Sequence, residues 1–404
     1  MVPLRLLTSV SASLLGSLSL LCTAAGAQPR PASPGPPARV TAALGEGLTA
    51  RSADGRFDLT LRARMQLRGT FLSAPPESTD EAVQGAEVRR MRLVLQGRFY
   101  SPHWRYYVQL GFSNGDTEPD LRLPLRDAAV FWTRFRDLNL RVGQGKVPFN
   151  HQRVVSSSNL AMVDRSLVQL ELNLDRDVGL MVSSNDLFGL GGRLGYRLGL
   201  FGGDGRNRVS TGSGLLYIAR VMVSPLGRGF DEGPENDLDR DPHPRLNLGA
   251  SVAYNDDSRR ARSTFGDTFI LGGFDTLSAE ADLLFKWRGF VVAAEWLYRE
   301  SRDAPRTVTS PNGSSLTERP RNAWGYFVQA GYAWSPRWDT TLRWGDLRPL
   351  GEASPVDRQR ELGASVGWYG QGHAFKIQAD YFYLAGEDFH AGRHQARMQI
   401  QLYF

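Results

Sequence analysis

Hydrophobic and polar residues alternate with a period of two along most of the chain, and segment 57–69 shows this most clearly. Apolar side chains occupy its odd positions, and polar side chains, three of them arginine, occupy its even positions. Because successive side chains of a β-strand point to opposite faces, this segment predicts a strand with one apolar and one polar face. Alternation over about eleven residues exceeds the usual soluble strand and approaches what a tilted strand needs to cross a bilayer. A single such strand would also fit a sandwich sheet. Whether the chain forms a membrane barrel therefore depends on how often the pattern recurs.

The same alternation returns without a helical interruption. Short connections such as 100–103 alternate with longer ones rich in Asp, Glu, Pro and Gly, such as 72–87 and 113–125, as in outer-membrane barrels. Tyr and Trp gather at segment ends, as in interfacial girdles. The pattern predicts an all-β fold, a transmembrane antiparallel β-barrel of about sixteen strands. The predicted strands are 57–69, 90–99, 103–112, 126–135, 138–142, 177–182, 192–201, 217–223, 246–254, 277–287, 290–298, 324–332, 338–344, 362–368, 375–383 and 394–404.

The last segment carries an apolar stripe that finishes on the terminal aromatic Phe404. It looks like the C-terminal signal strand of outer-membrane proteins, which the insertion machinery recognises. A strand edge this long and apolar would promote aggregation in an open sheet, so we expect it to close against the first strand. The implied partners are outer-membrane lipid and the insertion machinery, and the predicted location is the outer membrane of a Gram-negative bacterium.

Residues 1–27 are typical of a secretory signal peptide. Arg5 precedes an apolar stretch, and Ala-Gly-Ala at 25–27 forms a small-residue cleavage site. An uncleaved anchor and a lipidated Cys22 are the alternatives. Cys22 is the chain's one cysteine, so a cleaved protein has neither disulfides nor thiolate metal sites.

Amino-acid composition indicates where the barrel domain begins. Segment 28–56 is rich in Pro, Ala and Gly and is predicted to be a flexible N-terminal lead-in, so the barrel domain is 57–404. The mean hydropathy of −0.33 does not separate a soluble protein from a membrane barrel, because lipid-facing and water-facing residues cancel. The formal net charge is +6, and nearly all basic residues are arginine, a fixed planar cation.

Segment 143–176 breaks the alternation for more than thirty residues. Long non-repetitive loops in compact proteins are usually functional or disordered, and the apolar residues of this one predict that it packs. We expect an inward-folded loop that narrows the lumen. An extracellular lid and a subunit-contact loop are the alternatives.

Across 57–404 the chain resembles the phosphate-selective porin O/P family. The resemblance implies a sixteen-stranded, trimeric outer-membrane channel whose third loop folds into the pore. Members of that family include channels selective for phosphate or polyphosphate. The segments that carry the resemblance are RRMRL (89–93), RVGQGKVPF (141–149), SSS (156–158), DRSLV (164–168), RDVG (176–179), GGDGRN (202–207), RVMVSPLG (220–227), GF (289–290), AEW (294–296) and QAGY (329–332).

Anion selectivity requires fixed cations that face water at a narrow place, and guanidinium groups match phosphate oxygens in bidentate geometry. The predicted pore-lining arginines are Arg62, Arg64, Arg68, Arg90, Arg92, Arg98, Arg105, Arg193, Arg197 and Arg220, with Arg343 and Arg397 later in the chain. The constriction-loop cations are Lys146, Arg153 and Arg165, fewer than in phosphate channels of the family. The later strands point acids inward: Glu280, Asp282, Glu295, Glu361 and Asp380. We therefore expect passive diffusion of small solutes with an anion preference, and a general or carbohydrate-type diffusion porin is the alternative.

An enzyme is a distant alternative. Outer-membrane hydrolases use His with Ser or Asp, whereas the six histidines here are scattered over turns and loops. The acidic run 231–241 could offer oxygen ligands to Ca²⁺ but lacks EF-hand spacing, so we expect no metal. We also expect no cofactor and no nucleic-acid partner.

The most specific prediction concerns four inward arginines of the first two strands: Arg62, Arg64, Arg90 and Arg92. Few acidic residues accompany them in these strands, and each would cost ~2–4 kcal/mol if it faced lipid near the midplane. We expect them to stand side by side on one pore wall, so that neutralising them lowers anion over cation permeability without harming assembly.

Overall fold

The computed structural model describes residues 39–75, 81–118, 122–209 and 214–404. The chain separates into Met1–Pro37 and Ala38–Phe404, and the second unit contains every described strand. The predicted signal peptide lies outside the described residues. The first elements are β1 Arg39–Ala43, β2 Gly47–Arg51, β3 Asp58–Leu72, β4 Val83–Phe99, β5 Ser101–Gly111, η1 Asn114–Asp116, β6 Leu125–Trp132, β7 Asn139–Lys146, α1 His151–Val154, α2 Leu167–Leu172, β8 Arg176–Ser184, η2 Leu187–Gly189, β9 Leu194–Phe201 and β10 Leu216–Val223. They are followed by β11 Arg245–Ser258, β12 Phe274–Trp287, β13 Phe290–Glu300, β14 Arg306–Thr309, β15 Ser315–Glu318, β16 Ala323–Ser335, β17 Trp338–Pro349, β18 Gln359–His373, β19 Phe375–Ala385 and β20 Arg393–Tyr403.

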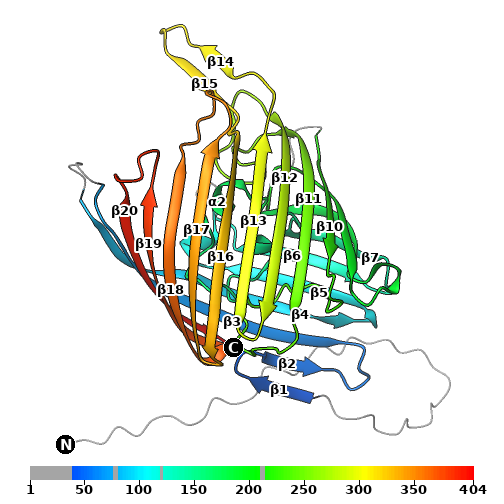
Figure 1. Ribbon diagram of the computed structural model, residues 1–404. Coiled ribbons are helices and arrows are strands. Elements are labelled where there is room, and N and C mark those ends of the chain that lie inside the picture. The colour runs from blue at the N-terminus through cyan, green and yellow to red at the C-terminus, as the bar shows by residue number, and fades with distance from the viewer. Residues whose placement is uncertain (1–38, 76–80, 119–121, 210–213) are drawn as a thin grey trace, which may run out of the picture. The chain divides into compact units, whose positions relative to one another are not determined.

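Sixteen of these strands form a closed antiparallel barrel (Figure 1). They are β3 to β13 and β16 to β20, each paired with its neighbours in sequence. The ring closes where β20 pairs with β3, with Met398 opposite Gly69 and Tyr403 opposite Arg64. The predicted fold, the strand number and the closure of the last strand on the first are confirmed. No described helix is long and apolar enough to cross a membrane.

The period of two separates the two faces of the wall. In β16, Phe327 and Gln329 are buried, while Val328 and Ala330 between and beyond them are exposed. Because the exposed positions of the wall carry apolar side chains, the outer surface suits lipid and the polar positions face inward. Other exposed apolar residues of the strands are Leu67, Val142, Val252, Leu342 and Ile400.

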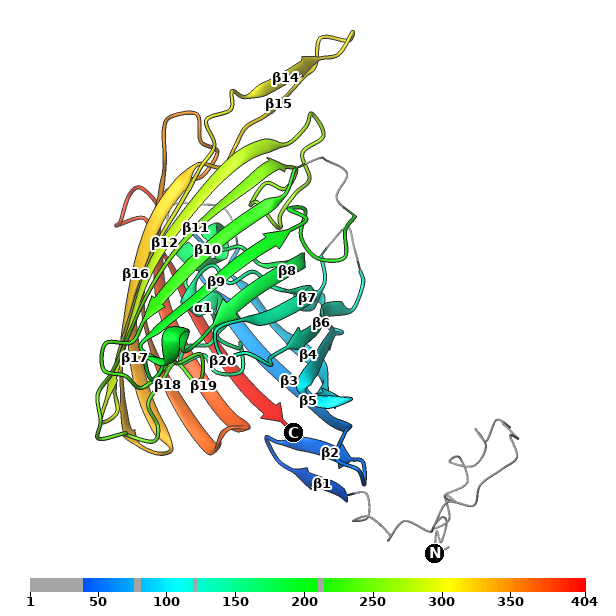
Figure 2. The same cartoon turned by 90° about the vertical axis from the view of Figure 1, so that its right-hand side faces the viewer.

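The connections differ at the two ends of the barrel (Figures 1 and 2). At one end, turns are as short as Arg288 and Gly289 between β12 and β13. At the other end lie segments 147–175, 259–273 and 301–322, the last of which contains the β14–β15 hairpin. We refer to these as the short-turn end and the long-loop end. In outer-membrane barrels the short turns face the periplasm.

Segment 147–175 connects β7 to β8 and is close to the predicted irregular stretch 143–176. It contains α1 and α2, and the Ser166 side chain caps α2 by accepting a hydrogen bond from the amide of Gln169. Helix α2 packs against β13, β16, β17 and β18. Val147, Phe149 and the apolar face of α2 form the largest buried cluster, together with inward residues such as Phe201 and Leu297. The segment packs as its apolar content predicts.

The structure differs from the predicted lead-in 28–56. Within it, β1 and β2 form a hairpin, and β2 pairs with residues 58–61 of β3. The positive φ angles of Gly45 (83°) and Gly47 (82°) allow the tight connection. An alanine Cβ at Gly47 would lie 2.2 Å from the carbonyl oxygen of Leu61. Two strands of five residues in a Pro- and Ala-rich stretch carry too little alternation to be recognised from sequence.

Candidate functional site

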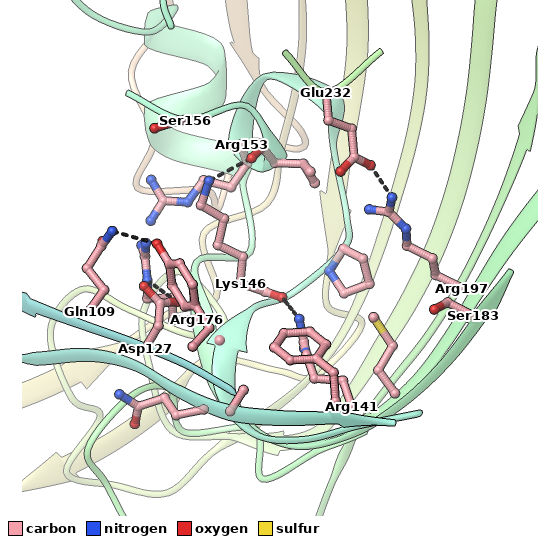
Figure 3. A pocket seen from close by; sticks show the side chains of 18 of the residues that line it. Gln109, Asp127, Arg141, Lys146, Arg153, Ser156, Arg176, Ser183, Arg197 and Glu232 are labelled. Atoms are coloured by element: carbon pink, nitrogen blue, oxygen red, sulfur yellow. Dashed lines mark hydrogen bonds and ion pairs between the residues drawn. The ribbon is translucent and has the colours of Figure 1, made fainter. Parts of the chain in front are cut away.

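A cavity of about 660 Å³ lies between segment 147–175 and the inner faces of β5 to β9 (Figure 3). Its lining is dominated by cations that come from strands β4 to β9 and from segment 147–175. Nine basic side chains line it: Arg92, Arg105, Arg126, Arg141, Lys146, Arg153, Arg165, Arg176 and Arg197. Asp127 and Glu232 are the acidic residues of the lining. The cavity is therefore strongly cationic.

Five of the nine cations have carboxylate partners. Asp116 pairs with both Arg92 (Nη2 to Oδ1, 2.6 Å) and Arg126 (3.4 Å). Burial by itself would raise the pKa of Asp116, but these two arginines hold it below its ordinary value. The remaining pairs are Arg176 with Asp127, Arg153 with Asp175 and Arg197 with Glu232. Because carboxylates offset the charge of these cations, their side chains contribute more to the shape of the cavity than to its positive charge.

The other four cations have no carboxylate within ion-pair distance among the described residues. Lys146 Nζ donates to the carbonyl oxygens of Val154 (2.6 Å) and Val155 (3.2 Å). Arg141 donates one hydrogen bond to the Lys146 carbonyl, and its Nε and Nη2 are buried without a partner. The other two are Arg105 and Arg165. Nine cations against four carboxylates leave the cavity with an excess of positive charge.

Segment 147–175 is attached to β3 and β4 through Asp164. The carboxylate lies 2.9 Å from Arg68 Nη1, 3.1 Å from Arg90 Nη2 and 3.3 Å from Arg89 Nη2. Burial by itself would raise the pKa of Asp164, but Arg90, Arg68 and Arg89 hold it well below its ordinary value. Asp164 therefore stays ionised, and three arginines converge on this one anchor.

The serines of the segment make further contacts with the same wall. Ser157 Oγ accepts from Arg64 Nη2 (3.0 Å) and Arg92 Nη1 (3.2 Å). The Ser157 carbonyl accepts from the side-chain amide of Gln66. The inward arginines of β3 and β4 thus position the segment, which explains how so many like charges share one wall.

Contacts on the opposite wall are equally specific. Glu295 on β13 accepts from the Asn150 side chain (2.8 Å) and from the Gln152 amide. Arg220 on β10 and Lys376 on β19 each donate at 2.8 Å to backbone carbonyls of the segment. The segment therefore contacts inward side chains from many strands of the ring.

Twelve of the predicted pore residues divide into three groups. Arg92, Arg105, Lys146, Arg153, Arg165 and Arg197 line the cavity. Arg64, Arg68 and Arg90 hold segment 147–175. Arg62, Arg98 and Arg220 pair with side chains of the wall: the Tyr403 hydroxyl, Asp58, and the acids Glu280 and Asp282, and Arg220 also donates to the Phe149 carbonyl of segment 147–175.

One predicted strand position differs from the structure. The predicted strand position of Arg193 is wrong, because β9 begins at Leu194 and Arg193 is an exposed turn residue that donates to the Pro225 carbonyl. Few acidic residues lie in the strands of Arg90 and Arg92, as predicted, but both arginines have carboxylate partners from elsewhere in the chain. Their partners Asp164 and Asp116 come from connecting segments, which inspection of the strands alone does not include.

Arg126, Arg141 and Arg176 also line the cavity, but their role was not predicted from the sequence. The alternation of β7 carried a usable signal, because Arg141 lies between the apolar residues Leu140 and Val142. The alternation gave no such signal for Arg126. A β-bulge where β5 and β6 pair allows two consecutive residues, Arg126 and Asp127, to line the cavity.

A closed sixteen-stranded barrel with an apolar outer surface and a cationic interior defines an outer-membrane channel of the porin class. Comparison of the sequence with family models identifies the family within this class. The chain belongs to the family of phosphate-selective porins O and P, whose model matches residues 60–404. The predicted family and the location in a Gram-negative outer membrane are confirmed.

Solved structures support the fold. The outer membrane channel DcaP of Acinetobacter baumannii is similar with a TM-score of 0.56 at 12% identity, covering 88% of this chain and 99% of that one. A loop L8 deletion mutant of OmpT, an outer membrane protein of Vibrio cholerae, gives 0.55 at 8% identity, covering 86% and 100%. OprB of Pseudomonas putida gives 0.52 at 10% identity, covering 87% and 95%. A sequence comparison with curated proteins gives no match.

Proposed function

We propose that this porin lets small anions diffuse passively across the outer membrane through the 660 Å³ cavity. The observation that carries the proposal is the set of four cations without carboxylate partners among the described residues: Arg105, Arg141, Lys146 and Arg165. They extend from the start of β5 at the short-turn end to segment 147–175. Fixed cations along a water-filled path favour anions electrostatically. Diffusion through such a path needs no catalytic group.

Segment 147–175 acts as the constriction in this proposal. It supplies Arg153 and Arg165 to the cavity, and its anchors on β3, β4, β10, β13 and β19 hold it against the wall. Because these anchors come from widely separated strands, the segment has little freedom to move as a unit. The width of the path is then fixed by folding.

Phosphate or a similar oxyanion is the substrate class that the arginines favour. Arginine side chains dominate the lining of the cavity, and guanidinium groups bind phosphate oxygens in bidentate geometry. Asp127 and Glu232 in the lining weaken the field, which favours the second candidate, a general diffusion porin with only a mild anion preference. A homotrimer is proposed by analogy with the trimer form of Vibrio cholerae OmpT.

Reversal potentials in planar bilayers under a salt gradient test the proposal. The wild-type channel should be anion-selective, and added phosphate should reduce the chloride current if phosphate occupies the path. Replacing Arg105 and Arg141 together by Gln should lower anion over cation permeability, since neither residue anchors segment 147–175 through an ion pair. R302Q is the matched control, because Arg302 is 90% exposed in a long loop. A cation-selective wild-type channel would exclude the proposed anion preference.

A further inference from the structure

One connection at the short-turn end is not short. Residues 224–244 join β10 to β11, whereas the turns after β12, β16 and β18 span only one or two residues. In an outer-membrane barrel, long connections are expected at the opposite end.

The middle of this connection is buried although it is highly polar. Glu235, Asn236 and Asp237 have exposed fractions of 4%, 6% and 8%. Asn236 Nδ2 donates to Asp339 Oδ2 on β17 at 2.9 Å, and Asp237 accepts from the Gly289 amide at 2.7 Å. The connection is thus bound to the inner wall at several strands.

Glu235 carries the connection deep into the barrel. Its Oε2 lies 3.3 Å from Nε2 of Gln329, which is six residues from the short-turn end of β16 at Ser335. The same carboxylate accepts from the Ala161 amide (3.0 Å) and the Gln152 side chain (3.2 Å) of segment 147–175. The two segments therefore meet in the barrel interior.

Little space remains around the connection. Two cavities lie beside it, one next to Glu235 and Gln329 and one next to Asp231 and Glu232, and each measures about 10 Å³. A space of that size holds about one water molecule, whereas the cationic cavity on the other side measures about 660 Å³. Hydrated ions fit only the larger space.

We propose that 224–244 is a second inward segment, which closes the part of the lumen beneath β11 to β18 from the short-turn end. Permeation is confined to the cavity along β5 to β9, and Glu232 stands at the edge of that path. The Glu232 carboxylate pairs with Arg197 (Figure 3). Because the Glu232 carboxylate offsets part of the Arg197 charge, it determines the strength of the positive field that acts on a permeating anion at this point.

The acidic run 231–241 is thereby explained without a metal. Asp231 pairs with Arg245 and Lys286, both at the short-turn ends of their strands. Glu235 and Asp237 bind amide groups. No group of three or more acidic or histidine ligands is arranged for a metal among the described residues.

Single-channel recording tests the closure directly. Residues 232–239 are replaced by a short Gly-Ser linker in the full chain, and folding is checked by heat-modifiable migration. The conductance should rise severalfold, because the space that the segment fills becomes open to ions. A folded variant with unchanged conductance would overturn the inference.

A cysteine variant tests the position of Glu232 without removing the segment. Cys22 is the only native cysteine, so E232C is modified at one site once Cys22 is absent or replaced by Ala. A cationic methanethiosulfonate should shift the reversal potential toward anion selectivity and an anionic one in the opposite sense, while D388C in a loop at the long-loop end should not respond. If E232C is also unresponsive, Glu232 does not border the path and the inference fails.

The inference rests on the proposed function only for the sign of selectivity. A raised conductance in a channel without anion preference would support the second inward segment and refute the proposed anion preference. An anion-selective channel with unchanged conductance and an unresponsive E232C would do the reverse.

Discussion

Replacing Asp164 by Asn should detach segment 147–175 from β3 and β4. The side chain keeps its shape but loses the charge that faces Arg68, Arg89 and Arg90 at 2.9–3.3 Å. Removing one member of a buried ion pair costs about 3–5 kcal/mol, because the remaining charges are left uncompensated. Since 1.4 kcal/mol is a factor of about ten, the docked segment should lose at least about two powers of ten in population ratio.

Trypsin cleavage and single-channel conductance both measure the loss of the docked state of segment 147–175. In D164N channels that still show heat-modifiable migration, trypsin should cleave at Arg153 or Arg165, and single-channel current should fluctuate between levels. D388N is the control, because Asp388 is exposed in the loop before β20. A folded D164N channel with full protease protection and steady current would refute the reasoning, since the ion pairs would then contribute no net stability to docking.

The same anchor predicts a pH dependence. The pKa of Asp164 is well below its ordinary value because Arg90, Arg68 and Arg89 outweigh the opposing effect of burial. A carboxyl with a lowered folded-state pKa contributes stability that is present above its unfolded pKa and is lost as the pH falls through the folded value. Wild-type channels should therefore keep segment 147–175 protected from neutral pH down to about pH 4, the ordinary Asp value, and open only under stronger acid.

Three further outcomes follow from the structure. Gln at four arginines should lower anion over cation permeability in bilayer recordings and also increase trypsin cleavage, because three of them contact segment 147–175. These four are Arg62, Arg64, Arg90 and Arg92. G143A should reduce the heat-modifiable fraction, since Gly143 has φ +118° and a Cβ would lie 2.3 Å from a carbonyl oxygen of β6; G69A, where nothing lies within 4 Å, should not. The wild-type protein should give a β-rich circular dichroism spectrum in detergent, and a helical spectrum would contradict the barrel.

The wall of the barrel was predictable because it depends on a local rule. Each strand presents one face to lipid and one to the interior, so residues two apart, such as Phe327 and Gln329, share a face whatever the rest of the chain does. The closure of β20 on β3 followed from the apolar stripe that ends at Phe404. Short strands such as β1 and β2, and the bulge at Arg126, break that rule and were missed.

The interior was less predictable, because it depends on contacts between residues far apart in the chain. Asp164 is next to Arg165 in sequence, yet its anchors lie 74 to 96 residues upstream. Glu235 lies in an acidic run whose composition does not indicate burial, yet its carboxylate accepts a hydrogen bond from Gln329, which is 94 residues away in the chain. The sequence indicated a cationic interior, and the fold determined which of the cations have a carboxylate within ion-pair distance.

The N-terminal hairpin has a consequence for the order of assembly. Residues 58–61 of β3 pair with β2, while residues 64–72 pair with β20 at the far end of the chain. The first pairing needs only nearby residues, whereas the second must wait until the last strand is delivered, and local contacts form sooner than distant ones. The hairpin can therefore cover the start of the β3 edge early. It leaves open only the stretch that matches β20, so an incoming strand from another molecule meets a shorter target and the correct register is favoured at the seam.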